Sequence, residues 1–405
     1  MSPSAADDQV VATLQELVAI PSVGGTEAEV EIQHHLADRL SDLGLEVDLW
    51  PIDVDALRAH PDYPGDEAPR SEAYGLVATN RPGAVVETIL QGHADVVPVG
   101  DPLPWRSPPF TPVLQGGSLV GRGTCDMKGG IAAILGAVAA TRDRHHDLPA
   151  FAVHLVIGEE DGGLGAFATL QRGHTGNSCV IPEPTSLRAV TANAGSLTFR
   201  IDVPGEATHG STRYAGSSAL DSYLGIHLAL GALERRRNAG PEDLVADLQI
   251  PYPLSVGRVR AGDWPSSVPD LLVAEGRYGL RIDEEPAAAR AELEAAVQEA
   301  ADQDPYLRDH APRVSWPGGQ YRGGRLPAGH GLLGRVGAAH EAVTGVSVGP
   351  ERGAPWGSDL RLYAGAGIPT LHYGPGDVCL AHGPNESVPI TEVLTATRVL
   401  TRLLG

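Results

Sequence analysis

Acidic and imidazole side chains occur in five short segments of the chain, most of them containing glycine or proline. The segments are Leu90-Gln-Gly-His-Ala-Asp-Val-Val-Pro98, Gly121-Arg-Gly-Thr-Cys-Asp-Met-Lys-Gly-Gly130, Ile157-Gly-Glu-Glu-Asp161, Ile181-Pro-Glu-Pro184 and Leu380-Ala-His-Gly-Pro-Asn-Glu386. Carboxylate and imidazole groups are ligands that zinc and related divalent metals accept in proteins. We interpret Asp126, in the second segment, as a carboxylate shared by two divalent metal ions.

The charges of the five segments agree with such a pair of metals. Two cations about 3.5–4 Å apart, as in two-metal hydrolases, repel each other unless anionic ligands surround them. Asp126, Glu160 and Glu183 supply three negative charges, and a bridging hydroxide would supply a fourth. His93 and His382 add one neutral imidazole to each metal. A nitrogen and oxygen ligand set without thiolate suits two Zn²⁺ per chain, with Co²⁺ or Mn²⁺ as alternatives.

Short hydrophobic runs that predict strands precede most of these charged groups. Residues 88–91 lead into His93, and residues 150–157 form a nearly unbroken hydrophobic run that leads into Glu159 and Glu160. Unbroken runs are typical of strands in a sheet covered on both faces. In open α/β sheets, ligands bind beyond the carboxyl ends of the strands. We therefore expect the five segments to converge at one edge of a sheet.

The pattern of expected elements divides the chain into three parts. Strands alternate with helices up to about residue 190, which predicts an α/β part over residues 1–192. The order strand, helix, two strands, helix, strand over residues 193–318 predicts an inserted ferredoxin-like domain. Residues 319–405 carry His382 and return to the first part. The expected fold class is therefore α/β, a mixed sheet flanked by helices, with an inserted α+β domain.

The composition of the chain argues against several classes of function. A chain of 405 residues favours two domains, and a formal charge of -21 argues against nucleic-acid binding and against an anionic membrane surface. The three cysteines, Cys125, Cys179 and Cys379, are odd in number and widely spaced, so we predict no disulfide framework. The first residues lack the basic and apolar regions of a signal peptide, so we expect no leader segment, and no run of about 18 apolar residues occurs in the sequence. We expect a cytoplasmic protein whose partners are small molecules.

Several of these residues also have a purely structural interpretation. Asp126 could cap the helix that follows it. Glu183 stands in a Pro-Glu-Pro sequence that ordinary loops also contain. Cys125 could be a nucleophile, but the sequence places no base beside it, so we interpret it as a packing residue. His154 lies within a hydrophobic strand and is interpreted as a core residue rather than a ligand.

The segments around His93, Asp126 and Glu159-Glu160, in this order, resemble the M20 family of metallopeptidases. This family includes acetylornithine deacetylase, succinyl-diaminopimelate desuccinylase, aminoacylase-1 and glutamate carboxypeptidase. The resemblance covers nearly the whole chain, including the insertion. It implies a Zn-peptidase-like catalytic domain, a lid and dimerisation role for the insertion, and a homodimer. It also implies a cis peptide bond between Asp126 and Met127.

The resemblance gives each residue of the five segments a role. It implies that Asp126 bridges two metals, that His93 and His382 each bind one of them, and that Glu160 and Glu183 each complete one. Glu159 would be the general base, which takes a proton from water and passes it to the leaving amine. Asp95 would orient the imidazole of His93.

Two further residues match positions that contact the substrate in the family. His209, in Ala207-Thr-His-Gly-Ser211, matches a histidine that donates to the oxyanion or to a substrate carboxylate, often across a dimer. Arg361, in Gly357-Ser-Asp-Leu-Arg361, matches an arginine that pairs with a substrate carboxylate. The chain has Ser267 where the family often has asparagine, and Thr-His-Gly where it has Ala-His-Ser. These differences argue against transferring the specificity for acetylornithine.

These observations predict a metal-dependent hydrolase that cleaves the amide bond of an N-acyl amino acid, similar to acetylornithine deacetylase. A dipeptidase or carboxypeptidase on the same scaffold is the alternative. A non-catalytic binding protein that keeps the fold is a second class of function. Loss of Glu159 or of a metal ligand would indicate that class, and none is lost. The sequence leaves open the acyl group, the amino acid side chain, the physiological metal and the oligomeric state.

Overall fold

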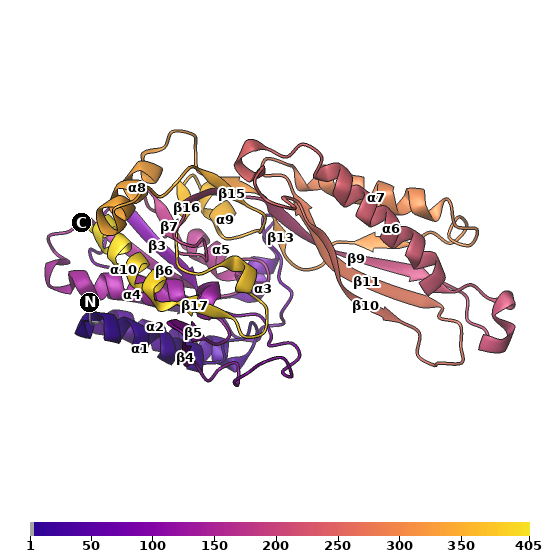
Figure 1. The fold of residues 1–405 in the computed structure, drawn as a ribbon, viewed down its shortest axis with the longest axis horizontal. Coiled ribbons are helices and arrows are strands. Elements are labelled where there is room, and N and C mark those ends of the chain that lie inside the picture. Colours follow the sequence, from indigo (N-terminus) through magenta and orange to yellow (C-terminus); the bar gives the residue numbers. More distant parts are fainter. Residues whose placement is uncertain (1–3) are drawn as a thin grey trace. The chain divides into compact units, whose positions relative to one another are not determined.

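The computed structural model describes residues 4–405, and these residues divide into two compact units (Figure 1). Unit 1 contains the chain up to Ala192 together with Arg325–Arg352 and Ser358–Gly405. Unit 2 contains Asn193–Gly324 and Gly353–Gly357. Each unit has its own hydrophobic core.

Unit 1 is built around a mixed β-sheet, as the sequence predicts. The strands lie in the order β1-β2-β6-β3-β7-β16-β8-β14. Neighbouring strands are parallel from β6 through β3 and β7 to β16, and antiparallel at β1, β2 and β8. The strands are β1 (Glu46–Pro51), β2 (Tyr74–Thr79), β3 (Thr88–His93), β6 (Phe151–Val156), β7 (Cys179–Ile181), β8 (Val190–Asn193), β14 (Gly324–Arg325), β15 (Arg352–Ala354) and β16 (Thr370–His372).

Helices cover both faces of this sheet. One face carries α1 (Ala5–Ala19), α2 (Glu27–Asp42), α4 (Gly129–Thr141), α8 (Gly331–Thr344) and α10 (Ile390–Leu404). The other face carries α3 (Val54–Arg58), α5 (Leu164–Gln171) and α9 (Leu360–Gly365). Side chains that alternate along a strand reach opposite faces, so Leu90 of β3 packs with α4 while Ile89 packs with α9. Covering both faces explains why the central strands are hydrophobic without interruption.

Smaller elements complete unit 1. A short antiparallel sheet in the order β17-β5-β4 packs against α1, α4 and α10. Its strands are β4 (Val113–Gln115), β5 (Ser118–Val120) and β17 (Ser387–Pro389). No helix among the described residues is long and apolar enough to cross a membrane.

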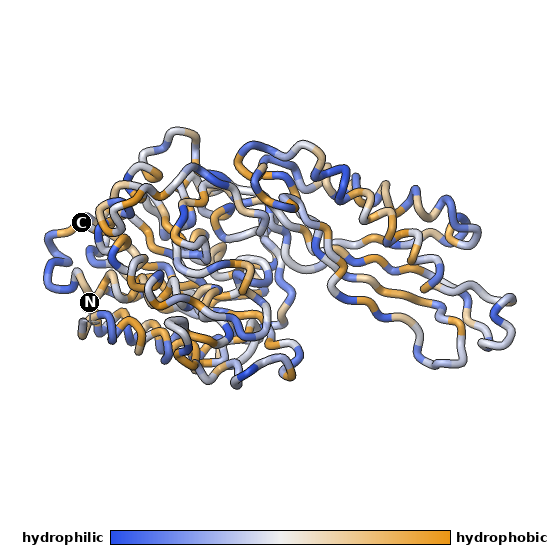
Figure 2. Tube along the Cα trace, viewed as in Figure 1, coloured by the Kyte–Doolittle hydropathy of each residue, from blue (hydrophilic) through white to orange (hydrophobic). Residues whose placement is uncertain are grey.

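Unit 2 has the ferredoxin-like order that the sequence predicts. Its antiparallel sheet has the strand order β10-β11-β9-β12, and its two helices pack together on one face. Figure 2 shows hydrophobic positions recurring along these strands between paler or blue ones. The elements are β9 (Gly195–Pro204), α6 (Ala219–Arg237), β10 (Leu254–Ala261), β11 (Leu271–Leu280), α7 (Pro286–Ala301), β12 (Arg313–Ser315) and β13 (Gln320–Tyr321).

The end of the insertion differs from the sequence-based boundary at residue 318. Residues 319–324 and 353–357 lie in unit 2. Residues 319–324 belong to unit 2 because they contain β13, in which Gln320 pairs with Leu197 and Tyr321 with Ser196 of β9. A two-residue strand has too few positions to show an alternating pattern, so nothing in the sequence marks it.

We expect the buried His154 in β6 to make the stability of unit 1 depend on pH. Its Nδ1 lies 2.8 Å from the hydroxyl of Tyr363, and burial, with nearby His174, lowers its pKa to about 3. An unfolded histidine titrates near 6.5, so the unfolded chain binds more protons between these two values. Stability is therefore lost as the pH falls through this window. We expect this one residue to cost about 2 kcal/mol between pH 6.5 and pH 5, at about 1.36 kcal/mol for each unit.

Urea unfolding of His154→Asn at both pH values measures this effect. The variant should lose less stability than wild type on acidification, because asparagine does not titrate. His146→Asn is the matched control, since the His146 side chain is 78% exposed and should leave the pH dependence unchanged. Equal pH dependence in wild type and His154→Asn would contradict the prediction.

Candidate metal centre

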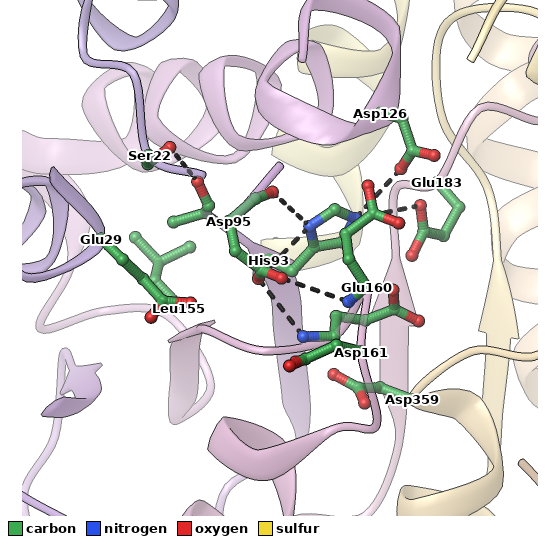
Figure 3. Close-up of polar contacts among 12 residues, drawn as sticks. Ser22, Glu29, His93, Asp95, Asp126, Leu155, Glu160, Asp161, Glu183 and Asp359 are labelled. Atoms are coloured by element: carbon green, nitrogen blue, oxygen red, sulfur yellow. Dashed lines mark hydrogen bonds and ion pairs between the residues drawn. The ribbon is translucent and has the colours of Figure 1, made fainter. Parts of the chain in front are cut away.

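The carboxyl ends of neighbouring parallel strands bring the predicted ligands together in unit 1. β3 ends at His93, β6 leads into the turn with Glu159 and Glu160, and β7 leads into Glu183. Because β6, β3 and β7 are parallel, these ends lie at the same edge of the sheet. Figure 3 shows His93 with Asp126, Glu160 and Glu183 around it. Ligand atoms of His93, Asp126 and Glu160 all lie within 4.8 Å of one another.

Asp126 lies between the two predicted histidines. Its Oδ1 is 3.0 Å from Nε2 of His93, and its Oδ2 is 3.5 Å from Nε2 of His382. Nε2 of His382 is also 3.0 Å from Glu160, and Nε2 of His93 is 3.9 Å from Glu183. The five side chains therefore form two groups, one around each histidine, that share Asp126.

The main chain around Asp126 is held by a residue to which the sequence assigned no role. The Glu386 Oε1 accepts hydrogen bonds from the backbone N–H groups of Cys125 (2.9 Å) and Asp126 (3.1 Å). The buried Arg122 donates to the other oxygen of Glu386 at 2.6 Å. Glu386 ends the same segment that contains His382, and this was the only sequence signal for it. The peptide bond between Asp126 and Met127 is cis, as the resemblance implied.

A close approach of two backbones sets the position of Glu183. A Cβ added to Gly130, in the first turn of α4, would lie only 2.3 Å from the carbonyl oxygen of Pro182. Only glycine therefore lets this turn of the helix lie against the loop that carries Glu183. This contact explains one of the two glycines that follow Lys128 in the sequence.

Asp95 contacts both His93 and the turn that follows β6. Nδ1 of His93 lies 3.0 Å from the backbone oxygen of Asp95 and 3.6 Å from its carboxylate. The carboxylate accepts instead from the backbone N–H groups of Glu159 (3.3 Å) and Glu160 (3.2 Å). The main chain of Asp95 thus orients the imidazole, while its side chain holds the acidic turn. The spacing of His93 and Asp95 in the sequence could not show whether the main chain or the side chain of Asp95 orients the imidazole.

Burial and mutual repulsion control the charge of the site. Burial raises the pKa of Glu159 and of Glu183 well above the usual value, and neighbouring carboxylates add to the effect. Burial disfavours the charged form of His93, yet Asp126 and Glu183 raise its pKa well above the usual value. Burial would also raise the pKa of Asp126, but contacts with His382 and His93 outweigh it and lower that pKa. Without added positive charge, the site therefore disfavours the ionisation of all its carboxyl groups together.

The residues present fit divalent cations. Buried carboxylates outnumber the positive groups that face them, and Oδ1 of the buried Asp359 has no hydrogen-bond partner among residues 4–405. A buried carboxylate remains ionised only when it is paired with a cation or hydrogen-bonded. The donors are carboxylates and imidazoles, the ligand types of zinc sites. Asp126, His93 and Glu183 would hold one metal, and Asp126, His382 and Glu160 the other.

Asp359 and Gln91 are residues of the site that the sequence analysis missed. Gln91 donates from Nε2 to Oδ2 of Asp359 at 2.9 Å. Burial raises the pKa of Asp359 to about 6, and Asp359 in turn raises the pKa of Glu159. Gln91 stands two residues before His93 on the same strand, a spacing that places both side chains on one face. This alternation along the strand is the sequence signal that could have identified Gln91 as a residue of the site.

The two predicted substrate-binding residues lie in different units. Arg361 is buried in unit 1, where Nη1 donates to the oxygen of Ser358 at 2.7 Å and Nη2 to that of Gly162 at 2.5 Å. Pairing of Arg361 with a substrate carboxylate stays a prediction. His209 is exposed in unit 2, where its Nδ1 lies 2.7 Å from the hydroxyl of Ser211. Its backbone forms an isolated bridge with Ser267, the residue that replaces the asparagine of the family.

The chain is similar to several known proteins. Residues 89–405 match Peptidase family M20/M25/M40. The chain is 28% identical to N-formyl-4-amino-5-aminomethyl-2-methylpyrimidine deformylase of Bacillus subtilis, covering 91% of this chain and 87% of the relative. It is 25% identical to acetylornithine deacetylase of Photorhabdus laumondii, covering 96% and 95%. The structure of the M20 family metallo-carboxypeptidase Sso-CP2 from Sulfolobus solfataricus aligns with a TM-score of 0.73 at 17% identity, covering 98% of both chains. The chain therefore belongs to peptidase family M20/M25/M40 and is a hydrolase.

Proposed function

We propose that the protein hydrolyses the amide bond of a small N-acyl amino acid, with two zinc ions and a water molecule. The observation that supports this most strongly is the pair of ligand groups that share Asp126, with the buried Glu159 beside them. When bound, two divalent metals supply Lewis acidity, which lowers the pKa of water and polarises the acyl oxygen.

Glu159 is proposed as the general base. Its backbone N–H is held by Asp95, and burial raises the pKa of its carboxyl group. A raised pKa lets one carboxyl group take a proton from water and later give it to the leaving amine. Glu160, the next residue, lies 3.0 Å from His382 and is proposed as a ligand. The turn after β6 therefore separates the two roles between adjacent side chains.

The substrate class is proposed from the relatives and from His209. Two relatives are named as a deformylase and a deacetylase, that is, enzymes that remove a small acyl group. His209 is exposed, and its Nε2 makes no hydrogen bond within the described part of the chain. We propose that this nitrogen donates to the oxyanion or to the carboxylate of the substrate. A dipeptidase or carboxypeptidase remains the alternative.

One panel of substrates tests this function. The protein is stripped with a chelator, reloaded with zinc, and assayed on N-formyl and N-acetyl amino acids and on dipeptides. We expect turnover of the N-acyl amino acids by the zinc-loaded protein and none by the stripped protein. Faster turnover of dipeptides would favour the alternative. Two bound metals without turnover of any compound would point to a binding protein and contradict the proposal.

We also propose that unit 1 is the catalytic domain and that unit 2 mediates a homodimer. Leu220, Leu224 and Leu228 lie four residues apart on α6 and are 44%, 55% and 73% exposed. Residues at this spacing share one face of a helix. Strand β10 lies at one edge of the sheet of unit 2. A second copy related by two-fold symmetry could cover both features. A cytoplasmic location stays a prediction.

A further inference from the structure

A buried arginine outside the predicted site has a hydrogen-bond acceptor for each N–H group of its side chain. Arg70 lies between α3 and β2, and its side chain is 0% exposed. Its guanidinium donates to both oxygens of Glu29, each at 2.8 Å, to both oxygens of Asp161 at 2.8 and 3.1 Å, and to the oxygen of Ala68 at 3.4 Å. The five N–H donors of an arginine are thus matched by five acceptors.

The Asp161 side of this cluster holds the acidic turn. Asp161 directly follows Glu160, and its Oδ2 also accepts from the backbone N–H groups of Glu67 (3.1 Å) and Ala68 (2.7 Å). Asp161 therefore ties the turn after β6 to the segment that carries Arg70. Asp95 holds the same turn through the N–H groups of Glu159 and Glu160. The turn is held by two sets of hydrogen bonds, one from the carboxylate of Asp95 and one from the Asp161 cluster.

The Glu29 side of the cluster holds the loop next to β3. Oε2 of Glu29 accepts from the N–H of Gly25 at 3.0 Å. In the same loop, Val23 forms a parallel bridge with Val96, and the Ser22 hydroxyl donates to the oxygen of Ala94 at 2.6 Å. Glu29 is therefore linked through this loop to the chain on either side of Asp95. Figure 3 shows Glu29, Asp95 and Asp161 in the same close-up.

Glycine makes room for this cluster. A Cβ on Gly24 or on Gly158 would lie 3.2 Å from Nη2 of Arg70. A Cβ on Gly162 would lie 2.0 Å from the oxygen of Gly65. The segment that carries Arg70 and the acidic turn can approach this closely only because these positions have no side chain. The contact is therefore specified by residues on both sides of it.

We propose that Arg70 is a positioning residue for the acidic turn and, through it, for Glu160 and Glu159. The proposal rests on the proposed function, because it concerns the metal that Glu160 and His382 would hold. Arg70 contacts neither Glu160 nor His382, the proposed ligands of that metal, so it acts through Asp161 and the main chain. Glu183 follows a different strand and does not depend on this cluster. Arg70 should therefore matter more for the metal at His382, whose proposed ligand Glu160 lies next to Asp161, than for the metal at His93, which the cluster reaches only through Glu29 and the loop beside Asp95.

Zinc titration of single-site backgrounds tests this difference. In His93→Ala only the position of His382 and Glu160 should bind Zn²⁺, and in His382→Ala only the position of His93 and Glu183. Lysine keeps the charge of Arg70 but cannot serve five acceptors. We expect Arg70→Lys to raise the Kd about 10–100-fold in the first background and to change it much less in the second. An equal effect in both backgrounds, or none in either, would overturn the proposal.

Hydrogen exchange provides a readout that needs no metal. In the metal-free protein, Arg70→Lys should speed amide exchange in peptides that cover residues 158–163, because one of the two supports of the turn is weakened. Arg237→Lys is the matched control, since Arg237 is a buried arginine of unit 2 paired with Glu284 and Glu292. It should leave both the turn and the zinc titration unchanged. Unchanged exchange in Arg70→Lys would count against the positioning role.

A second variant covers the case in which Arg70→Lys does not fold. Asp161→Asn keeps the shape of the side chain and leaves the pair between Arg70 and Glu29 intact. Like Arg70→Lys, it should raise the Kd for Zn²⁺ in the His93→Ala background, and it should leave the Kd unchanged in the His382→Ala background. If the wild-type protein does not bind two metals, the proposed function fails. The exchange measurement would still decide whether Arg70 positions the turn.

Discussion

Replacing Glu159 with glutamine is expected to lower kcat by about 10²–10⁴-fold while both metals remain bound. Glutamine has nearly the same size and keeps its backbone N–H for the hydrogen bond to Asp95. It cannot take a proton from water, which is the step assigned to Glu159. Steady-state kinetics on the best N-acyl amino acid measure kcat, and elemental analysis of the same protein measures its metal content.

The matched control for this prediction is Glu341→Gln, an exposed glutamate on α8. It should leave kcat and metal content unchanged. Two results would revise the assignment of Glu159. Retained turnover in Glu159→Gln would remove its role as general base. Loss of one metal would instead make Glu159 a ligand.

Replacing Asp126 with asparagine is expected to remove both metals and to reduce turnover to background. The two carboxylate oxygens of Asp126 face different histidines, at 3.0 Å for His93 and 3.5 Å for His382. Asparagine offers one oxygen and no charge, so neither group of ligands keeps its shared anion. Metal content by elemental analysis and zinc titration of the stripped protein measure the effect.

Single-ligand variants give this second prediction its controls. Glu183→Gln and His382→Ala each change only one of the two groups, so each should retain one metal per chain. Their folded structure, followed by circular dichroism, should match that of wild type. If Asp126→Asn retained two metals, Asp126 would not be the shared ligand, and the pairing of the five side chains would have to be revised.

The sequence predicts much of this site because its residues follow strands. His93, Glu160 and Glu183 could be placed at one edge of a sheet from hydrophobic runs alone, and the ferredoxin-like order of the insertion was equally clear. The supporting contacts could not be predicted. Glu29, Arg70 and Asp161 come from separate parts of the chain, and no spacing rule relates residues that meet only after folding. For the same reason the pairing of Arg122 with Glu386 appeared only in the structure.

Some local elements were also beyond prediction. The helix α8 contains three glycines, Gly331, Gly334 and Gly337, and one histidine, His340, a composition that does not favour a helix. His340 finds its partner in the hydroxyl of Tyr373, 2.7 Å away. This segment is therefore helical because it packs against the core, and not because of its helix propensity.

The order of the ligands along the chain has a consequence for synthesis of the protein. His93, Asp126, Glu160 and Glu183 all precede unit 2, whereas His382 follows it. Glu386, which holds the main chain of Asp126, and β16, which pairs with β7, also follow unit 2. The proposed metal centre can therefore be completed only after translation has passed unit 2.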